Sequence, residues 1–225
     1  MTNEGIGAVD RPVRRGGGRP TRAEAVRRDA RLLDVATTLF MERGFDGTSI
    51  DAVAEAAGVS KPTVYARYRD KRDLFAAVLR GRIREWLAPI SAAAEAQATA
   101  SNPENIETTL HELGRHMLSQ ASMPECATLK RILAAQAVQF PELAKLAHED
   151  GWQRGVRGVA ILLQQFAARG EIKLDDPELA AEMFLNLLLG HSARLAIHGM
   201  ATDPRFLERR SLAAVDLFLN GMRSR

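Results

Sequence analysis

Along most of this chain, apolar residues recur every three or four positions, which is the spacing of one face of an α-helix. The first clear stripe consists of Leu32, Val35, Ala36, Leu39 and Phe40. Gly44 follows it and suits the left-handed position just after a helix. A shorter stripe ends at Gly58 and contains Ile50, Val53, Ala54 and Ala57. No alternating strand pattern of useful length and no internal repeat occurs, so the chain is predicted to be all-α.

The helical pattern starts near Ala23, and capping residues mark the next three helices. Thr48, Ser60 and Asp70 are the predicted N-caps of the second, third and fourth helices. Later helices are expected near 103–121, 125–138, 141–169, 177–198 and 204–222. Four prolines lie at or next to predicted helix starts, a position that tolerates the missing N–H: Pro103, Pro141, Pro177 and Pro204.

The short third helix lies in the stretch GVSKPTVYARYRDK, which begins at Gly58. Val64 and Tyr68 are four residues apart and are expected to face inward. The outer edge is expected to carry Lys61, Pro62, Thr63, Tyr65 and Ala66. Two short helices joined by a tight turn form a helix-turn-helix, whose second helix can enter a DNA major groove.

Composition narrows the protein class. The chain has 225 residues, is 46% hydrophobic and has one cysteine, Cys126, so an intramolecular disulfide is excluded. The first 30 residues lack an apolar signal segment, and no apolar run approaches the length of a membrane span. We therefore expect a cytoplasmic protein without a membrane partner. We also expect Cys126 to be a buried small residue and not a redox sensor.

The net charge of +3 is unevenly distributed. Residues 1–80 hold 15 Lys and Arg against 11 Asp and Glu, giving +4, whereas residues 81–225 hold 16 against 17, giving −1. A basic N-terminal part on a near-neutral body indicates a head that binds a polyanion. Random scatter of surface charge explains the same count. The sequence motif of the N-terminal part therefore has to decide between the two interpretations.

From Arg28 to Trp86 the chain resembles the tetracycline-repressor (TetR) family of bacterial regulators. The resemblance rests on RGF-x-G-T-S, A-x-x-A-G-V-S-K-x-T-V-Y and the following D-K-x-x-L. It implies a homodimeric repressor of a double-stranded DNA operator, with a C-terminal helical domain that binds a small molecule and dimerises. The expected boundaries are a flexible basic arm (1–22), a DNA-binding domain (23–86) and a ligand-binding and dimerisation domain (87–225).

The resemblance also suggests DNA contacts at particular positions. Thr48, Tyr65 and Lys71 match positions that hold the DNA backbone, and the segment from Lys61 to Thr63, next to Ser60, matches positions near base edges. Arg67 stands where an aromatic residue is frequent, so it either contacts phosphate or pairs with Asp70. In the arm, Arg14, Arg15 and Arg19 either enter the minor groove or form a solubilising tail.

The C-terminal part suggests a dimer interface and an apolar pocket. PELAAEMFLNLLLGHSARLAIHG is apolar over most of its helical circumference, which indicates burial on two sides. The expected interface residues are Leu187, Leu188, His191, Leu195 and Phe218. The expected pocket residues are Trp86, Met117, Met123, Phe140, Trp152 and Phe166, and they favour a hydrophobic or aromatic effector. The fourth helix is expected to be the only long element shared by head and body.

Competing function classes find less support. No G-x-S-x-G, phosphate loop or nucleophile–base pair is present, so an enzyme is not expected, and no cofactor is implied. His111 and His116 are five residues apart, which does not match metal-ligand spacing, so no metal is expected. An all-helical scaffold or a small-molecule-binding protein without a DNA role remains the alternative, although it leaves the head motif unexplained.

Overall fold

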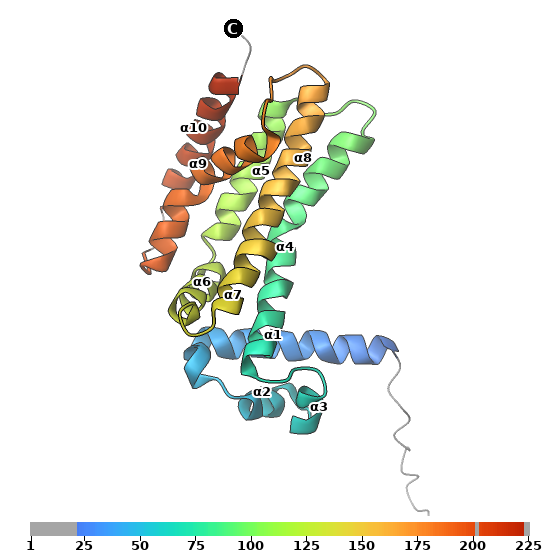
Figure 1. Cartoon of the computed structure of the whole chain (residues 1–225), viewed down its shortest axis with the longest axis vertical. Coiled ribbons are helices and arrows are strands. Elements are labelled where there is room, and N and C mark those ends of the chain that lie inside the picture. Colours follow the sequence, from blue (N-terminus) through green and yellow to red (C-terminus); the bar gives the residue numbers. More distant parts are fainter. Residues whose placement is uncertain (1–21, 201–202, 223–225) are drawn as a thin grey trace, which may run out of the picture.

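The computed structural model describes residues 22–200 and 203–222, and within them every regular element is a helix (Figure 1). The prediction of an all-α protein is therefore confirmed. The elements are α1 (Arg22–Gly47), α2 (Ile50–Ala57), α3 (Lys61–Tyr65), α4 (Lys71–Thr99), α5 (Ile106–Ala121), α6 (Pro124–Gln136), α7 (Pro141–Leu146), the π-helix η1 (Ala147–Gln153), α8 (Arg154–Ala168), α9 (Pro177–Ile197) and α10 (Pro204–Met222).

The head consists of α1, α2, α3 and the start of α4, with α1 lying across the lower end of α4 (Figure 1). Its core is built on Phe40, Phe45 and Phe75. The ring centres of Phe40 and Phe75 are 4.9 Å apart and those of Phe45 and Phe75 are 5.5 Å apart, both in edge-to-face packing. Gly44 has φ 70° and turns the chain near the end of α1, as predicted.

The body is a bundle of α4 to α10 around a second core. α4 and α8 approach each other very closely at Gly158. A Cβ atom added at this position would lie only 2.8 Å from Cγ2 of Ile90 on α4. The single helix expected over 141–169 is divided into α7, η1 and α8. The helix expected from Pro103 begins instead at Ile106, where the side chain of Asn105 accepts the N–H of Thr108.

Head and body share more than α4, which corrects the expectation that this helix is their only long link. Leu129 and Ile132 of α6 belong to the same buried cluster as the phenylalanines of the head. Phe140, just before α7, packs on Phe45 with ring centres 5.5 Å apart. Arg82 of α4 also reaches Glu125 of α6, with Nε 2.6 Å from the carboxylate. Both α4 and α6 therefore connect the head to the body.

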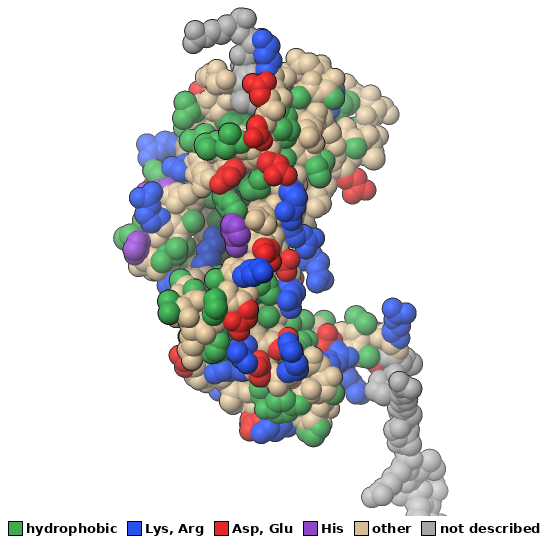
Figure 2. All heavy atoms as spheres, viewed as in Figure 1, with side chains coloured by type: hydrophobic (Ala, Val, Ile, Leu, Met, Phe, Trp, Pro, Cys, Tyr) green, Lys and Arg blue, Asp and Glu red, His purple; other side chains and the backbone are tan. Residues whose placement is uncertain are grey.

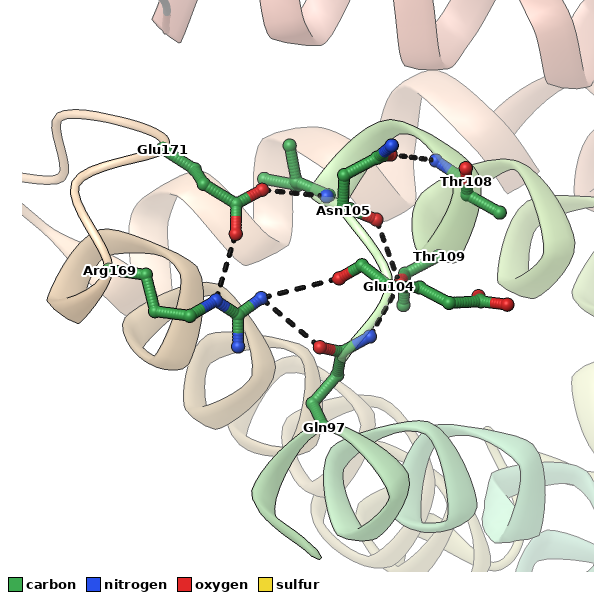
Figure 3. A network of polar contacts seen from close by, with 8 residues as sticks. Gln97, Glu104, Asn105, Thr108, Thr109, Arg169 and Glu171 are labelled. Carbon is green, nitrogen blue, oxygen red and sulfur yellow. Dashed lines mark hydrogen bonds and ion pairs between the residues drawn. The ribbon is translucent and has the colours of Figure 1, made fainter. Parts of the chain in front are cut away.

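The opposite end of α4 is held by a polar network (Figure 3). Gln97 donates to the Thr109 hydroxyl at 2.7 Å and accepts from Arg169 at 3.1 Å. Glu171 accepts from Nε of Arg169 at 2.8 Å and from the backbone N–H of Ile106 at 2.9 Å. These contacts join the C-terminal ends of α4 and α8 to the start of α5, so this end of α4 is fixed within the body.

Candidate nucleic-acid interface, effector cavity and dimer face

The two sides of α3 differ as the sequence predicts. Val64 is fully buried and Tyr68 is 8% exposed, so both anchor the helix to the head. The outer side is exposed, and it consists of Ser60, Lys61, Pro62, Thr63, Tyr65 and Ala66. The Tyr65 ring is 47% exposed although it is a large aromatic group. A short helix with a thin inner seam and a free polar face is suited to contact a DNA groove.

Polar contacts hold the outer side chains of α3 in place. Lys61 pairs with Asp51 of α2 at 2.8 Å, and this hydrogen-bonded pair raises the pKa of the Lys61 ammonium. The hydroxyls of Ser60 and Thr63 are 2.8 Å apart, so Ser60 stands at the N-cap position but its hydroxyl bonds Thr63 and not a backbone N–H. Over the lower half of the molecule as seen in Figure 2, acidic side chains lie beside many of the basic ones. Net positive charge alone therefore does not define the candidate DNA surface.

Arg67 does not pair with Asp70, which is one of its two sequence-based expectations. Its guanidinium pairs with Asp29 of α1 and donates to the carbonyl oxygen of Ala25 at 3.3 Å. The Tyr68 hydroxyl donates to the same Asp29 at 3.0 Å, and burial together with this bond raises the pKa of the phenol. Asp29 thus ties the end of α3 to α1, and Arg67 helps to position α3 instead of pairing with Asp70.

Two further predicted DNA contacts serve the head's own structure. Thr48 is 1% exposed, and its hydroxyl lies 2.8 Å from the carbonyl oxygen of Gly44 and 3.0 Å from that of Leu39. The N-cap of α2 is Ser49, which accepts the N–H of Ala52 at 3.1 Å, so the prediction for Thr48 is wrong. Thr48 is too deeply buried to reach phosphate.

The Lys71 ammonium also points to the protein and not to the outer face. It donates to the carbonyl oxygen of Phe45 at 2.7 Å and lies 4.5 Å from the centre of the Phe45 ring. These contacts close the junction between α1 and α4. Asp70, by contrast, caps α4 as predicted, accepting the N–H of Asp73 at 2.9 Å. The expected contacts of Arg14, Arg15 and Arg19 lie outside the described residues.

The body contains a cavity of about 270 Å³ with almost entirely apolar walls. It is bounded by α4, α5, α6, η1, α9 and the start of α8. Three of the six predicted pocket residues line it: Trp86, Met117 and Trp152. Residues that the sequence did not single out include Ile83 of α4, Gln120 of α5 and Lys130 of α6. These residues come together only because one face of each helix borders the same cavity. That arrangement depends on how helices distant in sequence pack, so it cannot be predicted from one helix alone.

The other three predicted pocket residues lie elsewhere. Met123 precedes α6 and is 51% exposed. Phe140 packs on Phe45 and under the Arg72 guanidinium, 5.3 Å from its ring centre, at the junction with the head. Phe166 is fully buried in the core of the body. Each prediction fails because an aromatic or sulfur-containing side chain fills a core or a junction as readily as it lines a pocket.

The predicted dimer residues divide into two groups. Leu188 is fully buried and Phe218 is 6% exposed, with its ring centre 5.2 Å from that of Phe184, so both belong to the core and not to an interface. Leu187, His191 and Leu195 are partly exposed. Strongly exposed apolar residues on the same two helices lie outside the list of predicted interface residues: Leu179, Met183, Ile197, Leu212 and Leu217.

The structure also bears on a metal site, on membrane-spanning helices and on Cys126. Within residues 22–200 and 203–222, no group of three or more His, Cys, Asp or Glu side chains is placed to hold a metal ion. Over the same residues, none of the helices has the length and apolarity needed to cross a membrane. Cys126 is buried as expected, and burial raises the pKa of its thiol.

Comparison with known families matches both parts of the chain. A family model described as "Bacterial regulatory proteins, tetR family" matches residues 32–78. A second model, described as "AefR-like transcriptional repressor, C-terminal domain", matches residues 108–221. The first match spans most of α1, all of α2 and α3 and the start of α4, and the second spans the helices from α5 to α10.

Individual relatives support the same assignment. The HTH-type transcriptional regulator AcrR of Shigella flexneri is 40% identical over 60 residues, which is 27% of this chain and 28% of AcrR. The chain thus matches little more than a quarter of that relative's length. A crystal structure of a TetR-family regulator from Mesorhizobium loti has a TM-score of 0.82 at 29% identity and covers 91% of this chain and all of the other. The flavonoid-responsive regulator FrrA has a TM-score of 0.65 at 29% identity, with 89% and 99% covered.

Proposed function

Because the chain belongs to the tetR family of bacterial regulatory proteins, which are transcriptional regulators and not enzymes, we propose that it is a ligand-released, homodimeric repressor. It binds a palindromic DNA operator through α3 and releases it when a small apolar effector enters the cavity. One observation carries this proposal. The exposed face of α3 is held by the head, and two helices packed on that head, α4 and α6, also line the cavity.

Base reading is assigned to the outer side of α3. Thr63 and Tyr65 offer hydroxyls, and Lys61 offers an ammonium already oriented by Asp51. The small side chain of Ala66 allows the backbone to approach the groove closely. Such contacts to base edges give sequence specificity, whereas contacts to phosphate give register and affinity.

The dimer is assigned to the exposed apolar face of α9 and α10. A shallow groove between these helices is lined by Leu187 of α9 and by Phe206, Arg209, Arg210, Ala213, Ala214 and Leu217 of α10. Phe206, Ala213 and Leu217 are seven and four residues apart, so they share one side of α10 with Arg209 and Arg210 between the first two. A two-fold axis through this face places the same patch of both chains in contact and presents two copies of α3 to two half-sites.

Release of DNA is assigned to movement of α4 and α6 relative to the fixed far end of the body. The network around Gln97 and Arg169 holds one end of α4 (Figure 3), while the other end of α4 follows Asp70, its N-cap, close to α3. The cavity lies along the stretch between them, at Leu79, Ile83 and Trp86. A ligand that binds better when these helices are displaced turns both heads and weakens both half-site contacts together. The flavonoid-responsive regulator among its structural relatives supports an aromatic effector.

Selection of binding sites from fragments of the genome, followed by footprinting, tests the proposal. We expect two protected half-sites, about one helical turn apart, arranged as an inverted repeat. A reporter placed behind the selected promoter should rise in expression when the regulator is deleted. Absence of any specific fragment would contradict DNA recognition, and a fall in reporter expression would contradict the repressor role.

A further inference from the structure

The cavity has one fixed positive charge in an otherwise apolar wall. Apart from Gln120, Cys126 and Lys130, its lining side chains are hydrocarbon groups, methionine sulfur, tryptophan rings and glycine positions. Gln120 has a partner, because its amide nitrogen lies 3.0 Å from Nε2 of His116. Lys130 is thus the one lining residue that carries a full charge among those the structure describes.

Lys130 is oriented toward the cavity by its place on α6. It lies one helical turn after Cys126 and one turn before Leu133, both of which also line the cavity. Cys126 is only 4% exposed and Lys130 is partly buried, so the stem of Lys130 packs along the wall of the cavity.

No carboxylate neutralises this charge within the described part of the chain. The lysines Lys61 and Lys145 each have an acidic partner, at 2.8 Å and 3.8 Å, but Lys130 has none within 4.0 Å. Glu125 lies nearby on α6, yet it is bound by Arg82 at 2.6 Å. Because the cavity wall is otherwise apolar, an anion that arrives with a ligand gains a strong, charge-assisted contact with this ammonium.

We propose that the effector is a small apolar monoanion whose carboxylate pairs with Lys130. This inference rests on the proposed function and specifies its ligand class. The apolar body of the ligand lies along Trp86 and Trp152, which line the same cavity from α4 and η1. The volume of about 270 Å³ favours a short alkyl chain or a single ring system as the apolar body, since it is near the lower end of known ligand sites.

The position of Lys130 also links this contact to the head. Leu129, the preceding residue, lines the cavity and belongs to the buried cluster of the head. Ile132, on the next turn, belongs to the same cluster. A carboxylate held by Lys130 therefore acts on the helix that packs against α1. A neutral ligand of the same shape lacks this contact with α6.

Matched acids and amides test the proposal directly. The probes are octanoate with octanamide and hydrocinnamate with its amide, titrated into the full-length protein without DNA. The chain has two tryptophans, and both line the cavity, so intrinsic fluorescence reports binding there. We expect at least one acid to bind about tenfold more tightly than its amide, because only the acid forms a charge-assisted bond with Lys130.

Three variants locate the effect. Lys130→Met keeps most of the stem but removes the charge, and it should abolish the preference for acid over amide. Lys145→Met makes the same change in net charge on an exposed residue outside the cavity, and it should keep the preference. Lys130→Arg keeps the positive charge and should retain at least part of the preference for acid over amide. Thermal melts of each variant establish that the fold is intact.

The proposal is overturned if both acids bind no better than their amides, if neither acid gives a saturable fluorescence change, or if Lys130→Met keeps the preference. The proposed repressor function fails separately. An acid that binds through Lys130 but leaves operator affinity unchanged supports the ligand class and contradicts ligand-induced release.

Discussion

The outer face of α3 and the cavity of the body are built in opposite ways. The face of α3 comes from seven consecutive residues, 60–66, of which one side chain, Val64, is buried. The cavity draws its walls from residues between Leu79 and Leu189, on helices that meet only in the folded chain. The first site is local and exposed, and the second is a pocket assembled from several helices.

This difference predicts how each site tolerates change. Substitutions on the face of α3 remove contacts to a partner and should leave the fold intact, because the side chains are exposed. Substitutions in the walls of the cavity alter packing and function together. The variants below separate these two kinds of effect.

The largest expected effect comes from charge inside the body core. Leu219→Glu buries a carboxylate at a position that is 2% exposed, which should cost several kcal/mol and unfold the body. Leu217→Glu places the same group two residues away, at a position that is 63% exposed, and should leave the helices folded while converting dimer to monomer. Circular dichroism and sedimentation velocity distinguish the two results. A dimer that survives Leu217→Glu would place the interface on another face.

The next effect concerns DNA binding. Tyr65→Ala should weaken binding to the selected operator by about 10- to 100-fold, the cost of a lost base or backbone contact of about 1–3 kcal/mol. The melting temperature should change little. Met123→Ala is the control, because Met123 has a similar exposure, 51% against 47%, but lies in the body. Gel-shift titration measures the affinities, and unchanged binding by Tyr65→Ala would mean that α3 presents another side to DNA.

A substitution at Lys71 distinguishes a DNA contact from a structural one. In sequence Lys71 matches a position that contacts DNA, but in the structure its ammonium donates to the carbonyl oxygen of Phe45. Lys71→Met should lower the free energy of unfolding by about 1–2 kcal/mol, through loss of a charge-assisted hydrogen bond. It should leave the salt dependence of DNA binding unchanged. A smaller slope of log affinity against log salt, by about 1, would instead show that Lys71 neutralises a phosphate.

These results also indicate which features the sequence can predict. The inward and outward sides of α3 follow from spacing within one helix, so Val64, Tyr68 and Tyr65 are assigned correctly. The partner of Arg67 is not predictable in this way, because Asp29 lies on α1 and meets it only when α1 folds against α3. The two tryptophans of the cavity are identified by residue type, whereas Lys130 and the burial of Phe166 depend on the phase of α6 and α8 in the bundle.

The smallest expected effect is the pH dependence of one helix cap. Hydrogen bonds from Arg72 and from the N–H of Asp73 lower the pKa of Asp70 in the folded protein. A lowered pKa stabilises the fold above the pKa of the unfolded chain, near 4, and this contribution disappears as pH falls through the folded value. Wild type should exceed Asp70→Asn in stability by no more than about 1 kcal/mol at pH 7. Urea melts at descending pH should show the gap closing, and a gap that grows in acid would contradict the assigned cause.

The central claim is that the cavity and the face of α3 are energetically coupled. Calorimetric titration of the tighter-binding acid, octanoate or hydrocinnamate, with and without saturating operator, tests this claim directly. Because coupling is reciprocal, an acid that releases DNA must bind more weakly when DNA is present, and we expect a difference of about tenfold or more. Equal affinities in the two titrations would contradict the account.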